Sequence, residues 1–147
     1  MRFGPRYKNV CANVVVSGAV INWVTSSRYL GVYLESCSKF KCSFASNKSK
    51  FYVAFNSLFG KIGHNASEEV LFALIMPILL YGVEACPTNS ADKQSLQFTM
   101  NRVLFKIFGA VAKYSYMEIS SHFGIYALEQ SIALRGQLFM SADSRHK

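Results

Sequence analysis

Residues 44–62 read FASNKSKFYVAFNSLFGKI, and this stretch decides the fold class because the spacing of the apolar residues changes there. From this point apolar side chains recur every three to four residues, the period of an α-helix. The predicted apolar face carries Phe44, Phe51, Phe55, Leu58, Phe59 and Ile62. The opposite, polar face is predicted to carry Asn47, Lys50, Ser57 and Lys61. Gly60 and Gly63 are predicted to end the helix.

Upstream of this helix, residues 7–34 have the composition of β-strands. Apolar β-branched residues fill 14–16 and 20–21, and the serine, glycine and alanine at 17–19 predict a turn between them. A second break is predicted at 25–27, followed by a strand over 29–34 that places Leu30, Val32 and Leu34 on one face. Residues 35–43 are predicted to form a polar connection.

Downstream, three further helices are predicted. Ser67 caps the first, which runs to about residue 76, where Pro77 bends or ends it. The next starts near residue 91 and ends at Gly109, and a last helix covers 127 to about 140 after a short segment at 117–123. The apolar stripe of the middle helix is Leu96, Met100, Val103, Leu104, Ile107 and Phe108.

The sequence therefore predicts an α+β fold. A short antiparallel β meander, over about residues 7–34, precedes a mostly helical bundle over about 44–141. The change of period places the domain boundary between 1–43 and 44–147.

Composition and charge point to a surface that meets other molecules. Hydrophobic residues make up 51% of the chain and charged residues only 16%, against about 25% in ordinary soluble domains. Residues 1–61 hold nine basic side chains and one acidic one, whereas the rest of the chain is balanced. A concentrated positive charge favours a polyanion, either nucleic acid or an acidic membrane face.

Residues for independent catalysis are missing from the sequence. Nucleotidyl transfer needs paired carboxylates that hold metal ions, but the only aspartates, Asp92 and Asp143, are far apart in sequence and neither is next to another acid. No Tyr-Xaa-Asp-Asp stretch occurs, so we predict no catalytic residue and no metal site. The four cysteines have no paired spacing and indicate reduced thiols of an intracellular protein. The uncharged run 70–83 is shorter than the roughly 20 residues of a membrane span, so no membrane partner is expected.

Two short stretches, RYLGVYL at 28–34 and PILLYGVE at 77–84, carry a family resemblance. In this order they resemble the end of the palm and the start of the thumb of a reverse transcriptase, especially those of retrotransposons that lack long terminal repeats. The likeness also includes RFGPR at 2–6 and FNSLFGK at 55–61, covers about residues 1–110 and fades beyond. It implies that 1–43 is the end of a palm with primer-grip strands and that 44–147 is a thumb-like region. The chain is expected to begin after the catalytic aspartates of such an enzyme.

The resemblance implies roles for particular residues. The primer grip holds the 3′ end of the primer, so Tyr29, Leu30 and Gly31 would lie nearest the primer, with Gly31 allowing close backbone approach. Arg28 would meet a phosphate. Lysines of the first thumb helix would follow the backbone of the template–primer duplex as sequence-blind contacts: Lys48, Lys50 and Lys61. The alternative for each lysine is an ordinary solvated helix face, and for residues 29–34 a plain core strand.

The implied function is that of a fragment of an RNA-directed DNA polymerase. It would contact RNA or an RNA–DNA hybrid, would need the missing palm and fingers, and would hold no cofactor itself, although the intact family enzyme uses Mg. Two alternatives stay open. One is a small basic module that binds nucleic acid or protein without enzymatic activity, which should be monomeric and melt cooperatively. The other is a secreted or membrane-attached protein with a leader at 10–22.

Overall fold

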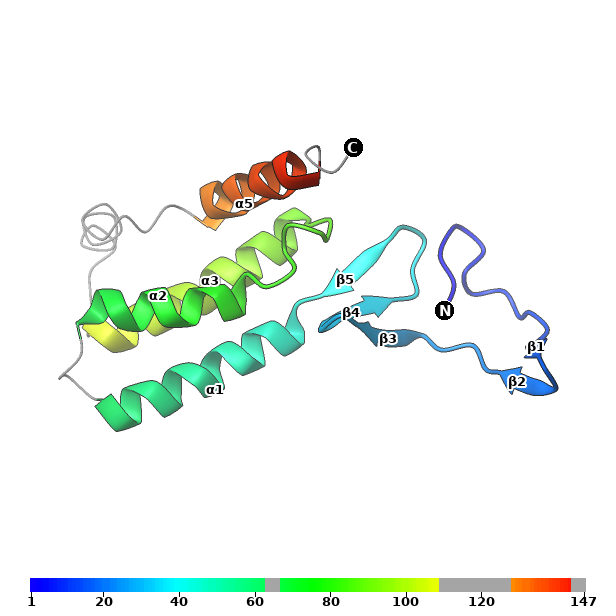
Figure 1. The fold of residues 1–147 in the computed structure, drawn as a ribbon, viewed down its shortest axis with the longest axis horizontal. Coiled ribbons are helices and arrows are strands. Elements are labelled where there is room, and N and C mark those ends of the chain that lie inside the picture. Colours follow the sequence, from blue (N-terminus) through cyan, green and yellow to red (C-terminus); the bar gives the residue numbers. More distant parts are fainter. Residues whose placement is uncertain (63–66, 109–127, 144–147) are drawn as a thin grey trace. The chain divides into compact units, whose positions relative to one another are not determined.

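The computed structural model describes residues 1–62, 67–108 and 128–143 (Figure 1). The chain divides into two compact units, Met1–Phe44 and Ala45–Lys147, which we call the β unit and the helical unit. The β unit contains two small antiparallel sheets and the helical unit contains the helices, which confirms the predicted α+β fold.

A two-stranded hairpin opens the β unit. β1 (Val14–Val16) pairs with β2 (Ala19–Ile21), with Val16 opposite Ala19. Ser17 and Gly18 form the turn with φ angles of 50° and 81°. Two successive positive φ angles are typical of the tight turns whose twist matches that of the flanking strands. The predicted turn is therefore confirmed, and both strands are exposed along their whole length.

A three-stranded sheet follows in the order β3-β4-β5, with β3 at Ser26–Tyr29, β4 at Val32–Glu35 and β5 at Lys41–Ser43. Three predictions were wrong in detail here. The predicted break at 25–27 lies partly inside β3, and the predicted connection at 35–43 contains β5. The predicted strand over 29–34 is interrupted, because Leu30 and Gly31 form the turn between β3 and β4.

Little of the β unit is buried. Val32 and Cys42 are buried on neighbouring strands, and Phe44 is buried at the end of the unit. The rings of Phe3 and Phe40 lie 5.5 Å apart between centroids, and a Lys41–Glu35 ion pair of 3.1 Å joins β5 to β4. Most strand residues thus remain accessible.

The helical unit contains α1 (Ala45–Ile62), α2 (Glu68–Leu79), α3 (Ser90–Phe108) and α5 (Leu128–Asp143). α1 packs against α2 and α3, and α3 packs against α5 (Figure 1). The predicted stripe of α3 is confirmed, with Phe108 half-buried at its end. The fully buried side chains include Phe51, Phe55, Leu71, Ile75, Leu79, Leu96, Met100, Val103 and Leu128.

Asn47 corrects the predicted helix face of α1. It was expected on the polar side, but it is only 4% exposed, and its Nδ2 donates to the Tyr81 carbonyl oxygen at 2.7 Å. The reason is its spacing: Asn47 precedes Phe51 by four residues, so both lie on the buried face. The buried amide satisfies a carbonyl in the turn that follows α2.

Helix ends also differ from the prediction at two residues. Gly60 lies inside α1, which ends at Ile62, and Gly63 lies outside the described residues. Pro77 lies inside α2, which continues to Leu79. A proline lacks the backbone N–H that would donate to the carbonyl four residues earlier. Helical bonding resumes after it, since the Leu80 N–H donates to the Met76 carbonyl at 3.1 Å.

Ser67 caps α2 as predicted, and its Oγ accepts from the Val70 N–H at 3.5 Å. Gly109 and the segment predicted at 117–123 lie outside the described residues. Within the described parts of the chain, no helix combines the length and apolar character needed to cross a bilayer.

Candidate nucleic-acid interface

The β3–β4 hairpin gathers four of the predicted contact residues at its tip. Arg28 and Tyr29 end β3, and Leu30 and Gly31 form the two-residue turn, with φ angles of 45° and 84°. Tyr29 is 65% exposed and Leu30 is 74% exposed. A leucine in the left-handed region is uncommon, because its Cβ approaches the neighbouring carbonyl. The tip therefore exposes two apolar side chains, and the backbone conformation of Leu30 is energetically unfavourable.

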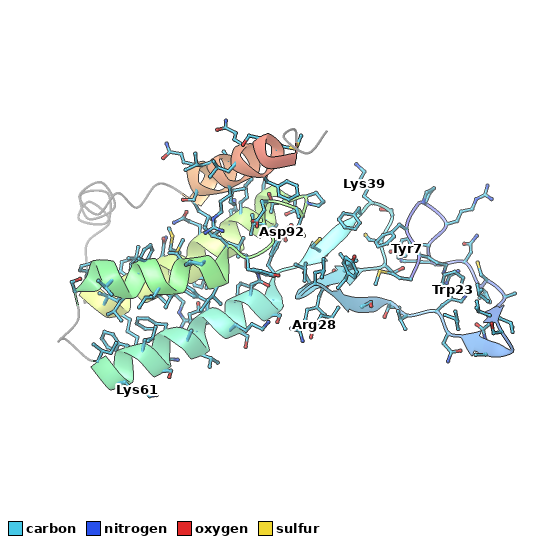
Figure 2. The ribbon with its side chains drawn as sticks, in the orientation of Figure 1. Tyr7, Trp23, Arg28, Lys39, Lys61 and Asp92 are labelled. Carbon is cyan, nitrogen blue, oxygen red and sulfur yellow. The ribbon has the colours of Figure 1, made fainter. Side chains whose placement is uncertain are left out.

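Arg28 gives this hairpin its charge (Figure 2). It is exposed on β3, directly opposite Tyr33 of β4, and Tyr29 follows it on the other face of the strand. In Met1–Phe44, all of which the structure describes, Glu35 is the only acidic side chain, and it pairs with Lys41. The Arg28 guanidinium is thus available for an anion such as phosphate.

Lys50 and Lys61 lie on one exposed face of α1 (Lys61 is labelled in Figure 2). Eleven residues separate them, which is about three turns, so they lie about 16 Å apart along the axis and on the same side. Ser57 lies between them on this face and is also exposed. Two cations at this spacing suit phosphates along one backbone better than a single bound anion.

Lys48 lies on a different side of α1 from these two lysines. Its Nζ donates to the Ser95 Oγ of α3 at 2.7 Å, and the side chain is half-buried. The bond links two helices of the bundle. The structure thus brings Lys50 and Lys61 together and separates Lys48 from them. Arg28–Gly31 and the lysines belong to different units, so each group stands as its own site.

A second basic feature runs along α3 beside aromatic residues of α1. The Arg102 guanidinium carbon lies 6.0 Å from the ring centroids of both Tyr52 and Phe98. The Lys106 Nζ lies 5.4 Å from the Phe55 centroid and donates to the Asn56 Oδ1 at 2.9 Å. Cations over ring faces stabilise such contacts between helices. The spacing of Arg102 and Lys106 indicated a basic edge, but not its aromatic partners.

The acidic groups of the described residues show no catalytic arrangement. Asp92 accepts from the Asn89 N–H at 3.2 Å, and Asn89 Oδ1 accepts from the Asp92 N–H at 2.8 Å, which is a reciprocal cap for α3. The side chain of Asp143 lies outside those described. Among the described residues no three His, Cys, Asp or Glu side chains cluster as metal ligands.

The Cys37 thiol has a lowered pKa. The backbone N–H of Lys39 hydrogen-bonds the sulfur and lowers the thiol pKa below its ordinary 9.0. Ser38 and the charge of Lys41 act in the same direction, and desolvation opposes them. Cys37 lies between β4 and β5, away from the hairpin tip in sequence.

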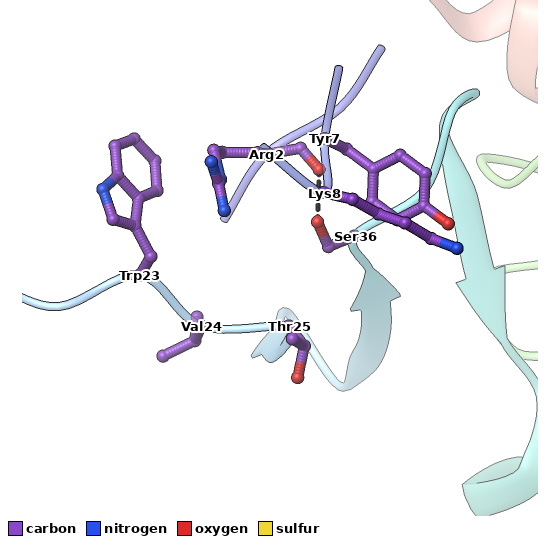
Figure 3. A pocket seen from close by; sticks show the side chains of 7 residues that line it. All are labelled: Arg2, Tyr7, Lys8, Trp23, Val24, Thr25 and Ser36. Carbon is purple, nitrogen blue, oxygen red and sulfur yellow. Dashed lines mark hydrogen bonds between the residues drawn. The ribbon is translucent and has the colours of Figure 1, made fainter. Parts of the chain in front are cut away.

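The β unit also contains a cavity of about 250 Å³ that the sequence did not reveal (Figure 3). Its lining includes Arg2, Tyr7, Lys8, Trp23 and Ser36. The available signal was a basic and aromatic stretch without any acid before Glu35. Nothing in their spacing showed that Trp23 would approach Arg2.

No protein-family model, no curated protein and no solved structure matches the chain. The resemblance to reverse transcriptases therefore depends on the sequence motifs and their order.

Proposed function

We propose that this chain is the end of the palm and the thumb of a reverse transcriptase of the retrotransposon type that lacks long terminal repeats. It binds the template–primer duplex and does not polymerise by itself. The observation that carries the proposal is the β3–β4 hairpin, which presents Arg28, Tyr29 and Leu30 at an exposed tip. The resemblance places the primer grip at these residues.

The hairpin tip suits the end of a primer for three physical reasons. The Arg28 guanidinium supplies donors for a phosphate. Tyr29 and Leu30 offer exposed apolar surface, against which a sugar or a terminal base can pack. The Leu30 conformation costs free energy, and such cost is retained most often where a residue binds something.

The α1 face supplies the contacts to the duplex. Lys50 and Lys61 are exposed on one side of the helix and make sequence-independent contacts to phosphates. We assign the structural bond to Ser95 as the main role of Lys48, since its Nζ is already engaged within the bundle. The motif at 77–84 has a structural role. Leu79 and Leu80 are buried, and the Tyr81 carbonyl accepts a hydrogen bond from Asn47 of α1.

The partners follow from the same assignment. Catalysis requires the metal-binding aspartates of the family, which this sequence lacks, so a palm and fingers must come from elsewhere. The intact enzyme would use Mg ions there, and we assign no metal to this chain. The expected nucleic acid is RNA or an RNA–DNA hybrid, and the expected location is inside the cell.

A salt titration tests the proposal. Binding of the full chain to a fluorescent RNA–DNA hybrid is followed by anisotropy at several salt concentrations. Lys50→Gln and Lys61→Gln should each reduce the slope of log affinity against log salt by about one, because each removes a phosphate contact. The control Lys39→Gln, which removes an exposed lysine of the β unit, should leave the slope unchanged.

Two results would contradict the proposal. The first is an affinity for the hybrid that does not depend on salt, or an equal loss of affinity in all three lysine variants. The second is primer extension by the pure chain with Mg and nucleotides, which would show that the chain polymerises without a partner.

A further inference from the structure

α2 is apolar on both its buried and its exposed sides. The exposed side, which we call the outer face of α2, consists of Val70, Ala73, Leu74 and Pro77. Val70 and Leu74 are 52% and 54% exposed and lie one helical turn apart. The other side is buried where α2 packs with α1 (Figure 1), and it includes Leu71, Ile75 and Leu79. A helix that is apolar all round is normally covered on every side, so we expect another molecule to cover the outer face.

The shape of the outer face suits a second helix. Val70 and Pro77 are seven residues apart, which is two turns and about 10 Å along the axis. Tyr81, 52% exposed, extends the apolar surface beyond the end of α2. Side chains at this spacing form a ridge that packs into the groove of another helix. A strand fits less well, because strand addition needs the open edge of a sheet, whereas the backbone bonds of a helix are internal.

The charge around the outer face is acidic, unlike that of the rest of the chain. Residues 62–92 contain four acidic residues and no lysine or arginine, although the whole chain has a net charge of +8. Glu68 and Glu69 stand in the first turn of α2, Glu84 follows Tyr81 by three residues, and no charged residue lies in between. The complementary surface is therefore an apolar helix face with basic residues at both ends.

Glu84 still lacks a cation. Its Oε2 is shielded from solvent, and no group in the described part of the chain donates to it. The ion pairs of the described side chains use other acids, Glu35 and Glu129. A shielded carboxylate oxygen without a donor costs free energy. Glu84 is only half-buried as a whole, so an arginine or lysine of a partner could supply the donor.

The same charges disfavour the other occupants of an apolar helix face. Nucleic acid and anionic membrane surfaces are repelled by carboxylates. A symmetric pairing of α2 with α2 of a second copy would bring acids to acids. In an antiparallel pair, Glu84 of one copy would meet the first turn of the other α2, with its two glutamates.

We propose that the outer face of α2 docks an amphipathic helix of another protein, with an apolar face of two to three turns and basic residues at both ends. Val70, Leu74 and Tyr81 bind its apolar face, and Glu84 pairs with one of its basic residues. The proposal goes beyond nucleic-acid binding and does not depend on the reverse-transcriptase assignment, because it uses neither the hairpin tip nor the α1 lysines.

Three fluorescent peptides test the docking by anisotropy on the full chain. The first is a short helical peptide with leucines at i, i+3, i+4 and i+7 and arginines at both ends. The second has glutamates in place of the arginines, and the third has glutamines in place of the leucines. The arginine peptide should bind saturably, and each of the others at least about tenfold more weakly. A non-specific attraction to this basic chain would give the opposite order, with the glutamate peptide preferred.

Matched variants locate the peptide on the outer face. Leu74→Ser should weaken the arginine peptide about tenfold. The control Val53→Ser changes an apolar side chain of α1 that is 66% exposed, and it should change the affinity less than about twofold. Glu84→Gln keeps the shape of the side chain and should reduce the preference for the arginine peptide severalfold. Unchanged helical ellipticity shows that each variant is folded.

Several results would overturn the proposal. One is that no peptide binds saturably, or that the glutamate peptide binds as well as the arginine peptide. Another is that Leu74→Ser and Val53→Ser weaken binding equally. A dimer of the chain alone that Leu74→Ser dissociates in sedimentation would make a second copy the occupant. Binding to phosphatidylserine vesicles that Leu74→Ser abolishes would make it a membrane.

Discussion

The β unit and the helical unit differ in where they keep their apolar side chains. The helical unit buries residues such as Phe51, Ile75 and Leu96 completely, whereas the valines of β1 and β2 are exposed on both strands. Burial of apolar surface is the main stabilising contribution in folding. The helical unit therefore has a buried core of its own, whereas the strands of the β unit leave most of their apolar side chains accessible.

The two hairpins of the β unit share a turn conformation but differ in the side chains that they carry there. Both have two-residue turns with successive positive φ angles, at Ser17–Gly18 and at Leu30–Gly31. Only the second carries a leucine at such an angle and an arginine two residues before it. The same backbone therefore serves as a plain turn in one hairpin and as an exposed apolar, basic tip in the other.

Substitution of a buried isoleucine by alanine should cost far more stability in the helical unit than substitution of an exposed isoleucine in the β unit. Ile75→Ala should lower the free energy of unfolding by about 2–5 kcal/mol, because it leaves a cavity in a fully buried site. Ile21→Ala, at a side chain 52% exposed, should change it by less than about 0.5 kcal/mol. Urea unfolding followed by helical ellipticity and by Trp23 fluorescence reads the helical and β units separately. Equal losses of unfolding free energy in the two variants would contradict the difference in burial between the units.

The buried side-chain amide of Asn47 should contribute to the stability of the helical unit. Asn47→Ala should destabilise this unit by about 0.5–1.5 kcal/mol, because it removes a buried hydrogen bond to the Tyr81 carbonyl. Asn56→Ala is the control on the same helix, since Asn56 is exposed and accepts from the exposed Lys106. Its cost should stay below about 0.5 kcal/mol. A similar cost for both would show that the buried bond contributes nothing special.

Asparagine substitutions at the two hairpin turns should have the same effect on stability but different effects on binding. Leu30→Asn and Ser17→Asn should each stabilise their hairpin by about 0.5–1 kcal/mol, because asparagine tolerates positive φ. Only Leu30→Asn should also weaken binding to the RNA–DNA hybrid severalfold. Amide hydrogen exchange and anisotropy measure the two properties. Unchanged hybrid affinity in the Leu30 variant would remove the tip from the interface.

The smallest effect concerns the Cys37 thiol. Its lowered pKa means that the reactive thiolate is populated at a lower pH in the folded chain than in the unfolded one. The pH profile of Cys37 alkylation, read by mass spectrometry, should therefore shift to lower pH in the native chain relative to the chain in urea. Coincident profiles would mean that the Lys39 N–H does not hold the sulfur in solution.

Much of the fold could be predicted because period and turn chemistry are local. The change from alternation to helical spacing placed α1 correctly, and the stripe of α3 identified its buried residues. The errors arose where local patterns conflict. Leu30 has the character of a strand residue, yet Gly31 beside it forms the turn. Pro77 is an ordinary helix breaker, yet α2 continues past it to Leu79.

The candidate sites were less accessible to sequence reasoning. The spacing of Lys50 and Lys61 already implied a shared face, but the Ser95 partner of Lys48 lies 47 residues away in sequence. The cavity joins Arg2 and Tyr7 to Trp23 and Ser36 through tertiary contacts. Composition can indicate that a region is basic and aromatic, whereas only a folded chain shows which rings and charges converge.

Hydrogen exchange of the two hairpins, with and without the RNA–DNA hybrid, shows whether the β3–β4 tip binds nucleic acid. The amides of residues 28–32 should exchange more slowly when the hybrid binds, while those of 14–21 should not change. The first hairpin serves as an internal control, since it has the same turn geometry without a charged residue. Equal protection of both hairpins, or no protection at the Leu30 tip, would contradict the assignment of this chain as a primer-grip and thumb fragment.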